Sequence, residues 1–427
     1  MDWSFLIKNK ESLNVTTDSR KVTPGCIFVA LKGEHFDGND FVPQVLEQGA
    51  EWVLMDNQSV YDQLPQELKP RVICSPSPCG EGRGEASGSL ALLQDLARAW
   101  RDTLTIPVIG ITGTNGKTTT KELCAAVLST RYNVLYTQGN YNNSLGVPLT
   151  LLNITRAHEI AIIEMGASHP GDIKELVEIA KPTYGLITNA GMAHLQGFGS
   201  FGGVMRTKAE LYEYIIEHDG KIFRNVDNPY LEQMQFDVMG DRIVHLIPYH
   251  TGTMPEGTHL VGGYNAENIS AALRVGLEFG INQERALAAI RAYVPSNNRS
   301  QLLQTERNIV VVDAYNANPT SMQAAINAFA NYQSPIPYPQ CYILGAMREL
   351  GDYSHTEHQN IVNMLLERKV DAVLLVGEEY KQTTTPYPVF DNVDALCEYL
   401  RVNPIAGARI LLKGSRSNQL EKVIPLL

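Results

Sequence analysis

The sequence predicts an α/β protein of three domains: a small α/β N-terminal domain, a central P-loop-type ATPase domain with a parallel sheet, and a C-terminal Rossmann-like domain. At 427 residues, the chain is longer than one ordinary hydrophobic core supports. Short β-branched strands alternate with amphipathic helices in two long blocks, which is typical of parallel sheets covered by helices. We expect the domains at residues 1–74, 89–295 and 296–427, with a linker at 75–88.

The N-terminal block already has this α/β pattern. We expect strands at residues 26–31 and 51–55, with a helix at 41–48 between them. Residues 75–88 are rich in Pro, Gly and Ser and lack the apolar side chains that would order them. This composition predicts a flexible linker to the central block.

The central block opens with an amphipathic helix at residues 90–100. Hydrophobic patterning then predicts strands at 108–112, 160–165 and 184–189, and helices at 117 to about 130, 170–180 and 266–279. Gly280 occupies the position just beyond the last helix, where glycine commonly ends a helix. The alternation predicts a mostly parallel sheet with helices on both faces.

The C-terminal block repeats the alternation. A helix is expected at residues 321–332 and another from Ser354, where Ser354 and Glu357 have the spacing of a capping box. Strands are expected at residues 309–313, 341–344, 372–376 and 409–412. This block is therefore predicted to be the Rossmann-like domain.

The overall composition is that of a globular protein that needs local cations to bind anions. Hydrophobic residues make up 44% of the chain, charged residues 19%, and the formal net charge is −11. This charge makes nucleic acid and anionic membranes poor partners, so a bound nucleotide would need cations such as Lys117 and Arg299. We expect no signal peptide, no membrane span and no zinc site, because the apolar runs are short and the six cysteines form no C-x-x-C pair. These features favour a cytoplasmic protein.

The most informative segment is the run Val108-Ile-Gly-Ile-Thr-Gly-Thr-Asn-Gly-Lys-Thr-Thr-Thr-Lys121. It predicts a strand, a glycine-rich turn and a helix, which together present backbone N–H groups and a helix terminus to a triphosphate. Lys117 can reach the β- and γ-phosphates, and the Thr118 hydroxyl can bind magnesium. The spacing is a shorter variant of the usual P-loop, since Ile111 stands where that pattern needs glycine. The alternative is a glycine-rich turn without a ligand.

Polar residues lie at the ends of neighbouring strands in this block. Thr118 begins a helix, Glu164 ends one predicted strand, and His194 follows another. Strand ends in an open α/β sheet are where ligands bind, and a hydroxyl, a carboxylate and an imidazole beside a triphosphate suit magnesium. By itself, Glu164 would be a solvated strand-end residue and Lys208 a surface lysine.

Further candidate binding residues lie in loops. Asn140, Asn142 and Asn143 fall within four residues, which suits a polar substrate better than a simple turn does. Arg299 lies at a domain junction, where it can neutralise charge when domains close, although a lone arginine is more often a surface cation. By contrast, the G-x-G-x-x-G run at residues 197–202 lies too far past its strand to bind a dinucleotide.

Taken together, these segments resemble the ATP-dependent Mur ligases of peptidoglycan synthesis over nearly the whole chain. The resemblance rests on the phosphate loop and on residues 17–21, 28–38, 139–143, 164–167, 188–189, 193–194, 313–319 and 412–416. The runs Tyr-Asn-Ala-Asn-Pro and Lys-Gly-Ser-Arg distinguish the branch that adds D-alanyl-D-alanine to a UDP-N-acetylmuramoyl-tripeptide. The resemblance implies that ATP activates the terminal carboxylate of the tripeptide as an acyl phosphate, which the dipeptide amine then attacks.

The resemblance also implies roles for individual residues. ATP would be bound by Gly113, Thr114, Asn115, Gly116, Lys117, Thr118, Thr119, Asn265, Asn268 and Arg299. Magnesium, expected as two ions, would be held by Thr118, Glu164, His194 and a carbamylated Lys208. The expected catalytic residues are Lys117, Glu164, His194 and Lys208. The UDP-linked substrate and the dipeptide would be bound by Asp18, Ser19, Arg20, Asn140, Asn142, Asn143, Asp313, Asn316, Asn318, Lys413 and Arg416.

Three features depart from the family pattern. Ala346 stands where an aspartate is usual, residues 227–262 are shorter than in most relatives, and the segment at 75–88 is unusual. Alternatives within the family are folylpolyglutamate synthase and the ligase that adds the third peptide residue. Outside it, a P-loop phosphotransferase or a non-catalytic descendant remains open. We expect a monomer.

Overall fold

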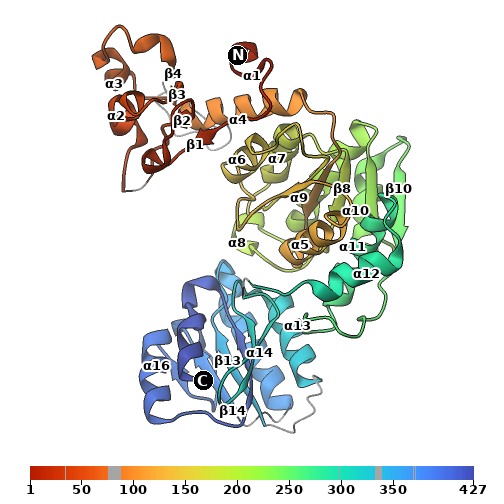
Figure 1. Cartoon of the computed structure of the whole chain (residues 1–427). Coiled ribbons are helices and arrows are strands. Elements are labelled where there is room, and N and C mark those ends of the chain that lie inside the picture. The colour runs from red at the N-terminus through yellow and green to blue at the C-terminus, as the bar shows by residue number, and fades with distance from the viewer. Residues whose placement is uncertain (34, 76–87, 297, 332–338, 369, 371) are drawn as a thin grey trace.

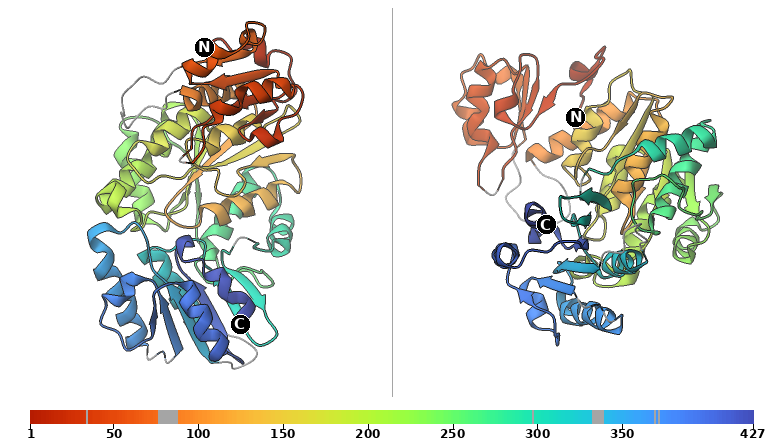
Figure 2. Two further views of the ribbon diagram at one scale, coloured as in Figure 1. Left: turned by 90° about the vertical axis from the view of Figure 1, so that its left-hand side faces the viewer. Right: turned by 60° about the horizontal axis from the view of Figure 1, so that its bottom comes forward.

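The computed structural model describes residues 1–427 except 34, 76–87, 297, 332–338, 369 and 371. Three sheets follow one another along the chain, each with its own helices. The central domain lies between the other two, which occupy opposite ends of the molecule (Figure 1; Figure 2, left). The predicted three-domain α/β class is confirmed. The domain boundaries stay predictions, and the predicted linker lies outside the described residues except for Ser75 and Gly88.

The N-terminal domain contains a four-stranded parallel sheet in the order β1-β2-β3-β4. Its strands are β1 (Val15–Thr16), β2 (Ile27–Val29), β3 (Trp52–Met55) and β4 (Val72–Cys74). Its helices are α1 (Ser4–Ile7), α2 (Val42–Glu47) and α3 (Gln58–Gln63). The predicted helix and the two predicted strands are present. Helix α2 and strand β3 are slightly shorter than expected, and β2 covers half of its predicted range.

Helix α4 (Gly88–Asp102) joins the N-terminal and central domains. One face buries Leu93, Leu96 and Trp100 in a core that includes residues of both domains. The Trp100 indole donates a hydrogen bond of 2.9 Å to the Ile154 carbonyl. The apolar spacing that predicted this helix therefore reflects the packing of this face against residues of both domains.

The central sheet has six parallel strands in the order β10-β9-β8-β5-β7-β6. They are β5 (Val108–Thr112), β6 (Val134–Tyr136), β7 (Ile160–Glu164), β8 (Tyr184–Ile187), β9 (Lys221–Asn225) and β10 (His245–Tyr249). Strands β5 and β7 are buried along their whole length, as expected for parallel strands covered on both faces. Because β5 lies between β7 and β8, the carboxyl ends of these three strands meet at one edge.

Helices cover both faces of this sheet, as predicted. Helices α4, α6 (Gly146–Leu152), α7 (Asp172–Ala180) and α9 (Phe201–Glu217) contribute to one core, and α5 (Lys117–Leu128), α11 (Asn265–Glu278) and α12 (Gln283–Ala292) to the other. The remaining helices are α8 (Leu195–Phe198) and α10 (Pro229–Met239). Gly280 has a φ of +73° just beyond α11, which confirms its predicted place.

The C-terminal sheet has the order β11-β12-β16-β13-β14-β15, and among its described strands only β11 is antiparallel. Its strands are β11 (Gln301–Gln304), β12 (Ile309–Asp313), β13 (Gln340–Gly345), β14 (Ala372–Val376), β15 (Val389–Phe390) and β16 (Arg409–Lys413). Its helices are α13 (Pro319–Ala330), α14 (Ser354–Glu367), α15 (Glu378–Lys381) and α16 (Val393–Val402). The predicted Rossmann-like character is confirmed.

One local prediction is wrong: Ser354 does not cap α14. A 3₁₀ turn, Gly351–Tyr353, runs directly into the helix, so Tyr353 precedes it in a helical conformation and makes no side-chain cap. A capping side chain needs an extended backbone at that position, which the turn excludes. The Ser354 hydroxyl instead lies 3.4 Å from Nδ1 of His358.

Two chain-wide expectations can be compared with the described residues. In that part of the chain, no helix combines the length and the apolar character that crossing a bilayer requires. The five described cysteines are free thiols, and four of them are buried. Burial raises the pKa of the Cys124 thiol to about 12, which makes it unreactive.

Candidate active site

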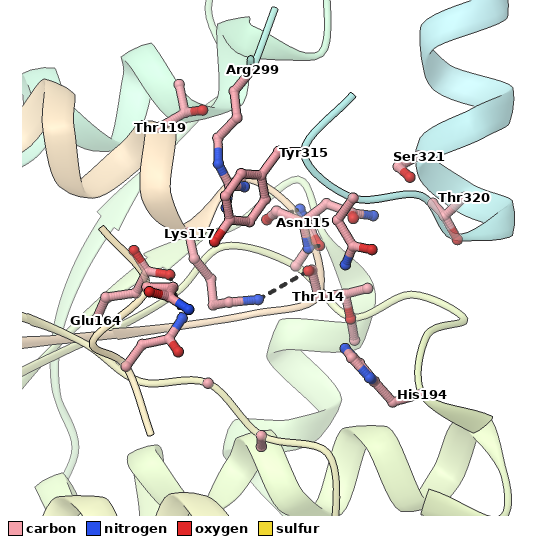
Figure 3. A pocket seen from close by; sticks show the side chains of 18 of the residues that line it. Thr114, Asn115, Lys117, Thr119, Glu164, His194, Arg299, Tyr315, Thr320 and Ser321 are labelled. Atoms are coloured by element: carbon pink, nitrogen blue, oxygen red, sulfur yellow. Dashed lines mark hydrogen bonds between the residues drawn. The ribbon is translucent and has the colours of Figure 1, made fainter. Parts of the chain in front are cut away.

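A pocket of about 880 Å³ opens between the central and C-terminal domains. The carboxyl ends of β5, β7 and β8 form one side. The end of β12, the residues that follow it, and Lys413 at the end of β16 contribute to the other. Figure 3 shows Lys117, Glu164, His194, Arg299 and Tyr315 around this space. Segments far apart in the sequence therefore converge on the predicted phosphate loop.

The phosphate loop has a backbone that only glycine permits at two positions. Gly113 has a φ of +145° and Gly116 a φ of +81°. A Cβ on Gly113 would lie 1.9 Å from Oγ1 of Thr188, and one on Gly116 would lie 2.3 Å from Oδ1 of Asn268. Helix α5 begins directly after Gly116, so its first N–H groups are available to an anion, as predicted.

The Lys117 side chain lies over this loop. Its ammonium donates hydrogen bonds to the carbonyls of Gly113 (2.7 Å) and Thr114 (3.1 Å). Burial lowers the pKa of Lys117 to about 8; the charge of Glu164 opposes this shift, and that of Arg299 adds to it. Lys117 is therefore a buried cation at a helix N-terminus, where a bound phosphate would supply the opposite charge.

Two residues at the end of β8 hold the loop in place. Thr188 Oγ1 donates to the Asn115 carbonyl (2.6 Å), and the Asn189 side chain accepts from the Asn115 N–H (2.9 Å). The Asn189 carbonyl also accepts from the Thr114 N–H at 3.0 Å. The sequence marked Thr188 and Asn189 only as part of a family motif; their position one strand away from the loop in the sheet explains their role.

Glu164 lies at the end of β7 inside the pocket wall. Its Oε1 accepts hydrogen bonds from Thr118 Oγ1 (3.1 Å) and Asn142 Nδ2 (2.8 Å). Its Oε2 is buried without a hydrogen bond, although the ammonium of Lys121 lies 3.8 Å away. The structure thus brings together two of the predicted magnesium ligands.

This donor set fits magnesium. A buried carboxylate oxygen without a hydrogen bond and an adjacent hydroxyl are hard oxygen ligands. Among the described residues, no group of three or more His, Cys, Asp or Glu side chains could hold a metal. Magnesium is commonly bound by one or two carboxylates with phosphate oxygens and water, so one carboxylate beside a phosphate loop is sufficient.

Of the two other predicted magnesium ligands, His194 lines the pocket and Lys208 does not. His194, with a φ of +50°, places its Nδ1 against the carboxylate of Glu349 from the C-terminal domain. In Figure 3, Lys117 lies between Glu164 and His194. Burial lowers the pKa of His194, while the charge of Glu349 opposes that shift. His194 therefore contacts a carboxylate across the domain boundary in this structure.

Lys208 is buried in α9, not exposed as its local sequence would suggest. Only 2% of its surface is accessible, and no described carboxylate lies within ion-pair distance. Burial, and then the charge of Lys117, hold its pKa well below the usual range. Its ammonium lies 5.8 Å from the centre of the Phe198 ring. A neutral amine at this position is the form that could react with carbon dioxide.

The asparagine loop lines the pocket, but two of its amides also have structural contacts. Asn142 donates to Glu164, and Asn143 Oδ1 accepts from the Gly146 N–H at 2.8 Å, at the start of α6. Asn140 lines the pocket as well. The amides of Asn265 and Asn268, predicted near the nucleotide, likewise line the pocket while bonding to other side chains.

The C-terminal side of the pocket contains a stacked and a paired cation, Arg299 and Lys413, whereas Arg416 is not among the residues that line it. The Arg299 guanidinium lies 3.8 Å from the centre of the Tyr315 ring, and that of Arg416 lies 5.2 Å from the same ring. The Lys413 ammonium pairs with Asp313 (2.9 Å), which satisfies both charges. The sequence included Tyr315 only as part of a family motif, and its contacts with two predicted binding arginines mark it as a further residue of this site.

Two predicted residues of this side form contacts with neighbouring backbone or with the phosphate loop. The Asn316 carbonyl accepts from Lys413 at 2.8 Å, and Asn316 lines the pocket. Asn318 caps α13 and donates to Oδ1 of Asn115 at 2.8 Å. The phosphate loop and the C-terminal domain are therefore in direct contact.

The remaining predicted residues lie in the N-terminal domain, away from this pocket. Asp18 accepts hydrogen bonds from the backbone and the side chain of Arg20, and these bonds lower its pKa to about 2. Ser19 begins the 3₁₀ turn Ser19–Lys21, which contains Arg20. None of the three lines the pocket. Their predicted contact with a UDP-sugar would require a substrate that spans both domains.

Ala346, which stands where the family usually has an aspartate, is packed in the protein interior. Ala346 is fully buried, its carbonyl accepts from the Asn418 amide at 2.8 Å, and a Cβ on Gly377 would lie 2.6 Å from its methyl group. The nearby carboxylate that does reach the pocket is Glu349.

Comparison with known proteins identifies the family. Three family models match: "Mur ligase family, catalytic domain" at residues 13–76, "Mur ligase middle domain" at 111–245 and "Mur ligase, glutamate ligase domain" at 298–416. The chain is 33% identical to the UDP-N-acetylmuramoyl-tripeptide–D-alanyl-D-alanine ligases of Bacillus subtilis and Escherichia coli. These matches cover 96% and 97% of the chain and 92% and 93% of the relatives.

A solved structure agrees with these matches. The MurF ligase of Thermotoga maritima in complex with ADP superimposes with a TM-score of 0.82 at 26% identity, over 98% of each chain. Family models and relatives thus account for all three domains. The chain belongs to the Mur ligase family.

Proposed function

We propose that the chain is an ATP-dependent ligase that adds D-alanyl-D-alanine to a UDP-N-acetylmuramoyl-tripeptide. The observation that carries this proposal is a single pocket that joins a phosphate loop to polar side chains of the C-terminal domain. The names of the full-length relatives in Bacillus subtilis and Escherichia coli support the choice of substrates. A nucleotide, a carboxylate and an amine could meet in this pocket.

The reaction has two steps. A carboxylate is a poor electrophile, so its oxygen first attacks the γ-phosphorus of ATP, and the bond between γ-phosphorus and the bridging oxygen breaks to release ADP. The amine of the dipeptide then adds to the carbonyl carbon of the acyl phosphate and gives a tetrahedral intermediate. This collapses with loss of the amine proton and of inorganic phosphate, which keeps one carboxylate oxygen. Both steps concentrate negative charge at the γ-phosphate, where preorganised cations stabilise it.

Lys117 and Arg299 supply these cations. The Lys117 ammonium already bonds to the loop carbonyls, and a bound phosphate would take their place. Nε of Arg299 is buried without a hydrogen bond, so it is available to an anion. The loop N–H groups at the start of α5 complete the cradle.

Thr118 and Glu164 would hold a magnesium ion, with Asn142 orienting the carboxylate. A bound magnesium ion would neutralise charge on the β- and γ-phosphates. We further propose that His194 and a carbamylated Lys208 would hold a second ion. Lys208 supports this because it is buried with a depressed pKa, which favours the neutral amine that forms a carbamate.

The two peptide substrates would approach from opposite sides. Asp18, Ser19 and Arg20 would hold the UDP end, and Asn140 and Asn143 the peptide. The dipeptide would bind beside Asp313, Asn316, Asn318, Lys413 and Arg416. A cytoplasmic, monomeric enzyme is part of the same proposal.

The alternatives differ in what their substrates must be. A sister ligase would accept a different amine, and a phosphotransferase would need no amine. The test is release of phosphate from ATP with magnesium, D-alanyl-D-alanine and UDP-muramoyl tripeptides that carry either lysine or diaminopimelate, omitting each component in turn. We expect release only with all components, together with a pentapeptide product by mass. Release that ignores the dipeptide would refute the proposed function.

A further inference from the structure

A chain of buried hydrogen bonds runs from the helix behind the phosphate loop to the domain junction. Thr120 Oγ1 donates to Asn268 Oδ1 (3.0 Å), Asn268 Nδ2 donates to Asn265 Oδ1 (2.9 Å), and Asn265 Nδ2 donates to Ser300 Oγ (3.3 Å). Each of these four residues is less than 9% exposed. All three donors point in the same direction, which allows each bond to polarise the next.

Two members of this hydrogen-bond chain lie at functional parts of the pocket. Asn268, which accepts from Thr120, packs against Gly116 so closely that a Cβ on the glycine would lie 2.3 Å from the amide oxygen. At the other end, the Ser300 N–H donates to Oδ1 of Asp313 (3.3 Å), whose Oδ2 pairs with Lys413 (2.9 Å). The Ser300 hydroxyl also lies 2.7 Å from the Tyr264 hydroxyl.

Ser300 occupies a special backbone position at the junction. It follows Arg299 directly and has a φ of +50°, and Asn298 has a φ of +56°. Such positive φ values cost energy for residues other than glycine and persist only where surrounding contacts hold them. Ser300 connects α11 of the central domain to Asp313 at the end of β12 in the C-terminal domain, and Asp313 pairs with Lys413.

We propose that Ser300 is a positioning residue that couples the phosphate loop to the amine-binding end of the pocket. The proposal rests on the proposed ligase activity. A nucleotide that orders Gly116 would fix Asn268, Asn265 and the Ser300 hydroxyl in turn, and the Ser300 N–H would fix the carboxylate that orients Lys413. Binding of the nucleotide and of the dipeptide would then favour each other.

The most discriminating variant is Thr120→Val. Thr120 does not line the pocket, and of the residues in this series of hydrogen bonds it is the one separated from Lys413 by the most bonds. Valine keeps the shape and removes the hydroxyl. We expect the KM for D-alanyl-D-alanine to rise by about threefold to tenfold, the range for one buried hydrogen bond. Ser300→Ala should raise this KM to a similar extent. Thr120→Ser, which keeps the hydroxyl, should restore the wild-type value.

The double variant separates coupling from two local effects. If the residues act through one chain, Thr120→Val with Ser300→Ala should be no worse than the more damaging single change. Thr130→Val is the matched control, since among the described residues its hydroxyl bonds only to the Val127 carbonyl near the end of α5. A Thr120→Val enzyme with a KM for the dipeptide and a kcat within about twofold of wild type, or fully multiplicative effects, would overturn the proposal.

Binding provides a second test that uses only Ser300→Ala. A non-hydrolysable ATP analogue should tighten D-alanyl-D-alanine binding to the wild-type chain by about threefold or more, and this enhancement should vanish in Ser300→Ala. The same enhancement in both proteins would overturn the proposal even if Thr120→Val did not fold. Absence of dipeptide-dependent turnover in the wild type would instead refute the proposed function itself.

Discussion

Replacing Lys117 with alanine should slow the reaction strongly while leaving the fold intact. The ammonium bonds to two loop carbonyls, Gly113 at 2.7 Å and Thr114 at 3.1 Å, and no carboxylate is paired with it among the described ion pairs. Its charge is therefore available to a phosphate. In this structure Lys117 also lies at the start of α5, where the helix terminus adds to the positive potential.

The magnitude follows from Coulomb's law. Two unit charges about 4 Å apart interact by about 4 kcal/mol at an effective dielectric constant near 20. Because about 1.4 kcal/mol corresponds to a tenfold change in rate, the upper estimate is about 1000-fold in kcat/KM. Loss of one preorganised charge stabiliser usually costs at least about 100-fold, which gives the lower estimate.

The assay is dipeptide-dependent phosphate release at low ATP concentrations with the other substrates saturating, which gives kcat/KM for ATP. The melting temperature checks folding. Lys174→Ala is the matched control, because Lys174 is an exposed lysine of α7 outside the pocket. It should retain wild-type activity. A folded Lys117→Ala enzyme within about fivefold of wild type would refute the role assigned to this ammonium.

Three further predictions concern the same site. First, Gly113→Ala should weaken ADP binding at least about tenfold, because its Cβ would lie 1.9 Å from Thr188 Oγ1. Gly171→Ala is the control: Gly171 has a φ of +88° and open space around it, so the change should only lower the free energy of unfolding by about 1–2 kcal/mol through backbone strain. Equal behaviour of the two variants would contradict this account. Second, Lys208→Ala should lose activity that short carboxylic acids partly restore, if the lysine is carbamylated; a fully active variant would exclude that role. Third, because the pKa of Lys117 is lowered to about 8, the free enzyme loses this charge above that pH, and ADP affinity should fall by up to about tenfold per pH unit. The same depressed pKa means that the unfolded chain binds more protons between about pH 8 and 10.5, so this group makes stability rise with pH in that window. Lys117→Ala should show neither trend in isothermal titration and thermal unfolding, and persistence of both would show that another group titrates.

The sequence predicted the parts of the fold that depend on long, regular patterns. The strands at 309–313 and 372–376 have the predicted bounds, because continuous apolar runs between helices mark buried parallel strands. Strands of two or three residues such as β1 and β15 were missed, because so few residues show no periodicity. The false cap at Ser354 arose because the residue spacing could not reveal the preceding 3₁₀ turn.

Lys208 shows how helical spacing could have identified a buried site residue. It precedes Leu211, Tyr212 and Ile215 by three, four and seven positions, and all three are buried. Residues at these spacings share one face of a helix, so the lysine belongs to the buried face of α9. Its local motif concealed this, because Arg206 and Glu210 beside it suggest an exposed turn.

Contacts between domains could not be predicted from the sequence. Glu349 reaches His194, and Asn318 reaches Asn115, across more than 150 residues of intervening chain. These pairs depend on how the two domains are placed and not on any local pattern. The bonds of Asn265 and Asn268 likewise could not be predicted from local sequence. The motif placed both side chains near the nucleotide, and the structure shows that Asn268 bonds to Thr120 and Asn265 to Ser300.

The central claim is that the carboxylate of the peptide substrate becomes an acyl phosphate before the amine attacks it. This claim can be tested by labelling the terminal carboxylate of the UDP-muramoyl tripeptide with 18O and measuring the inorganic phosphate by mass spectrometry after one turnover with ATP and D-alanyl-D-alanine. The account predicts phosphate that contains one labelled oxygen, with the other label in the new amide carbonyl. Unlabelled phosphate alongside a full yield of pentapeptide would contradict it, because the carboxylate oxygen would not have been joined to phosphorus.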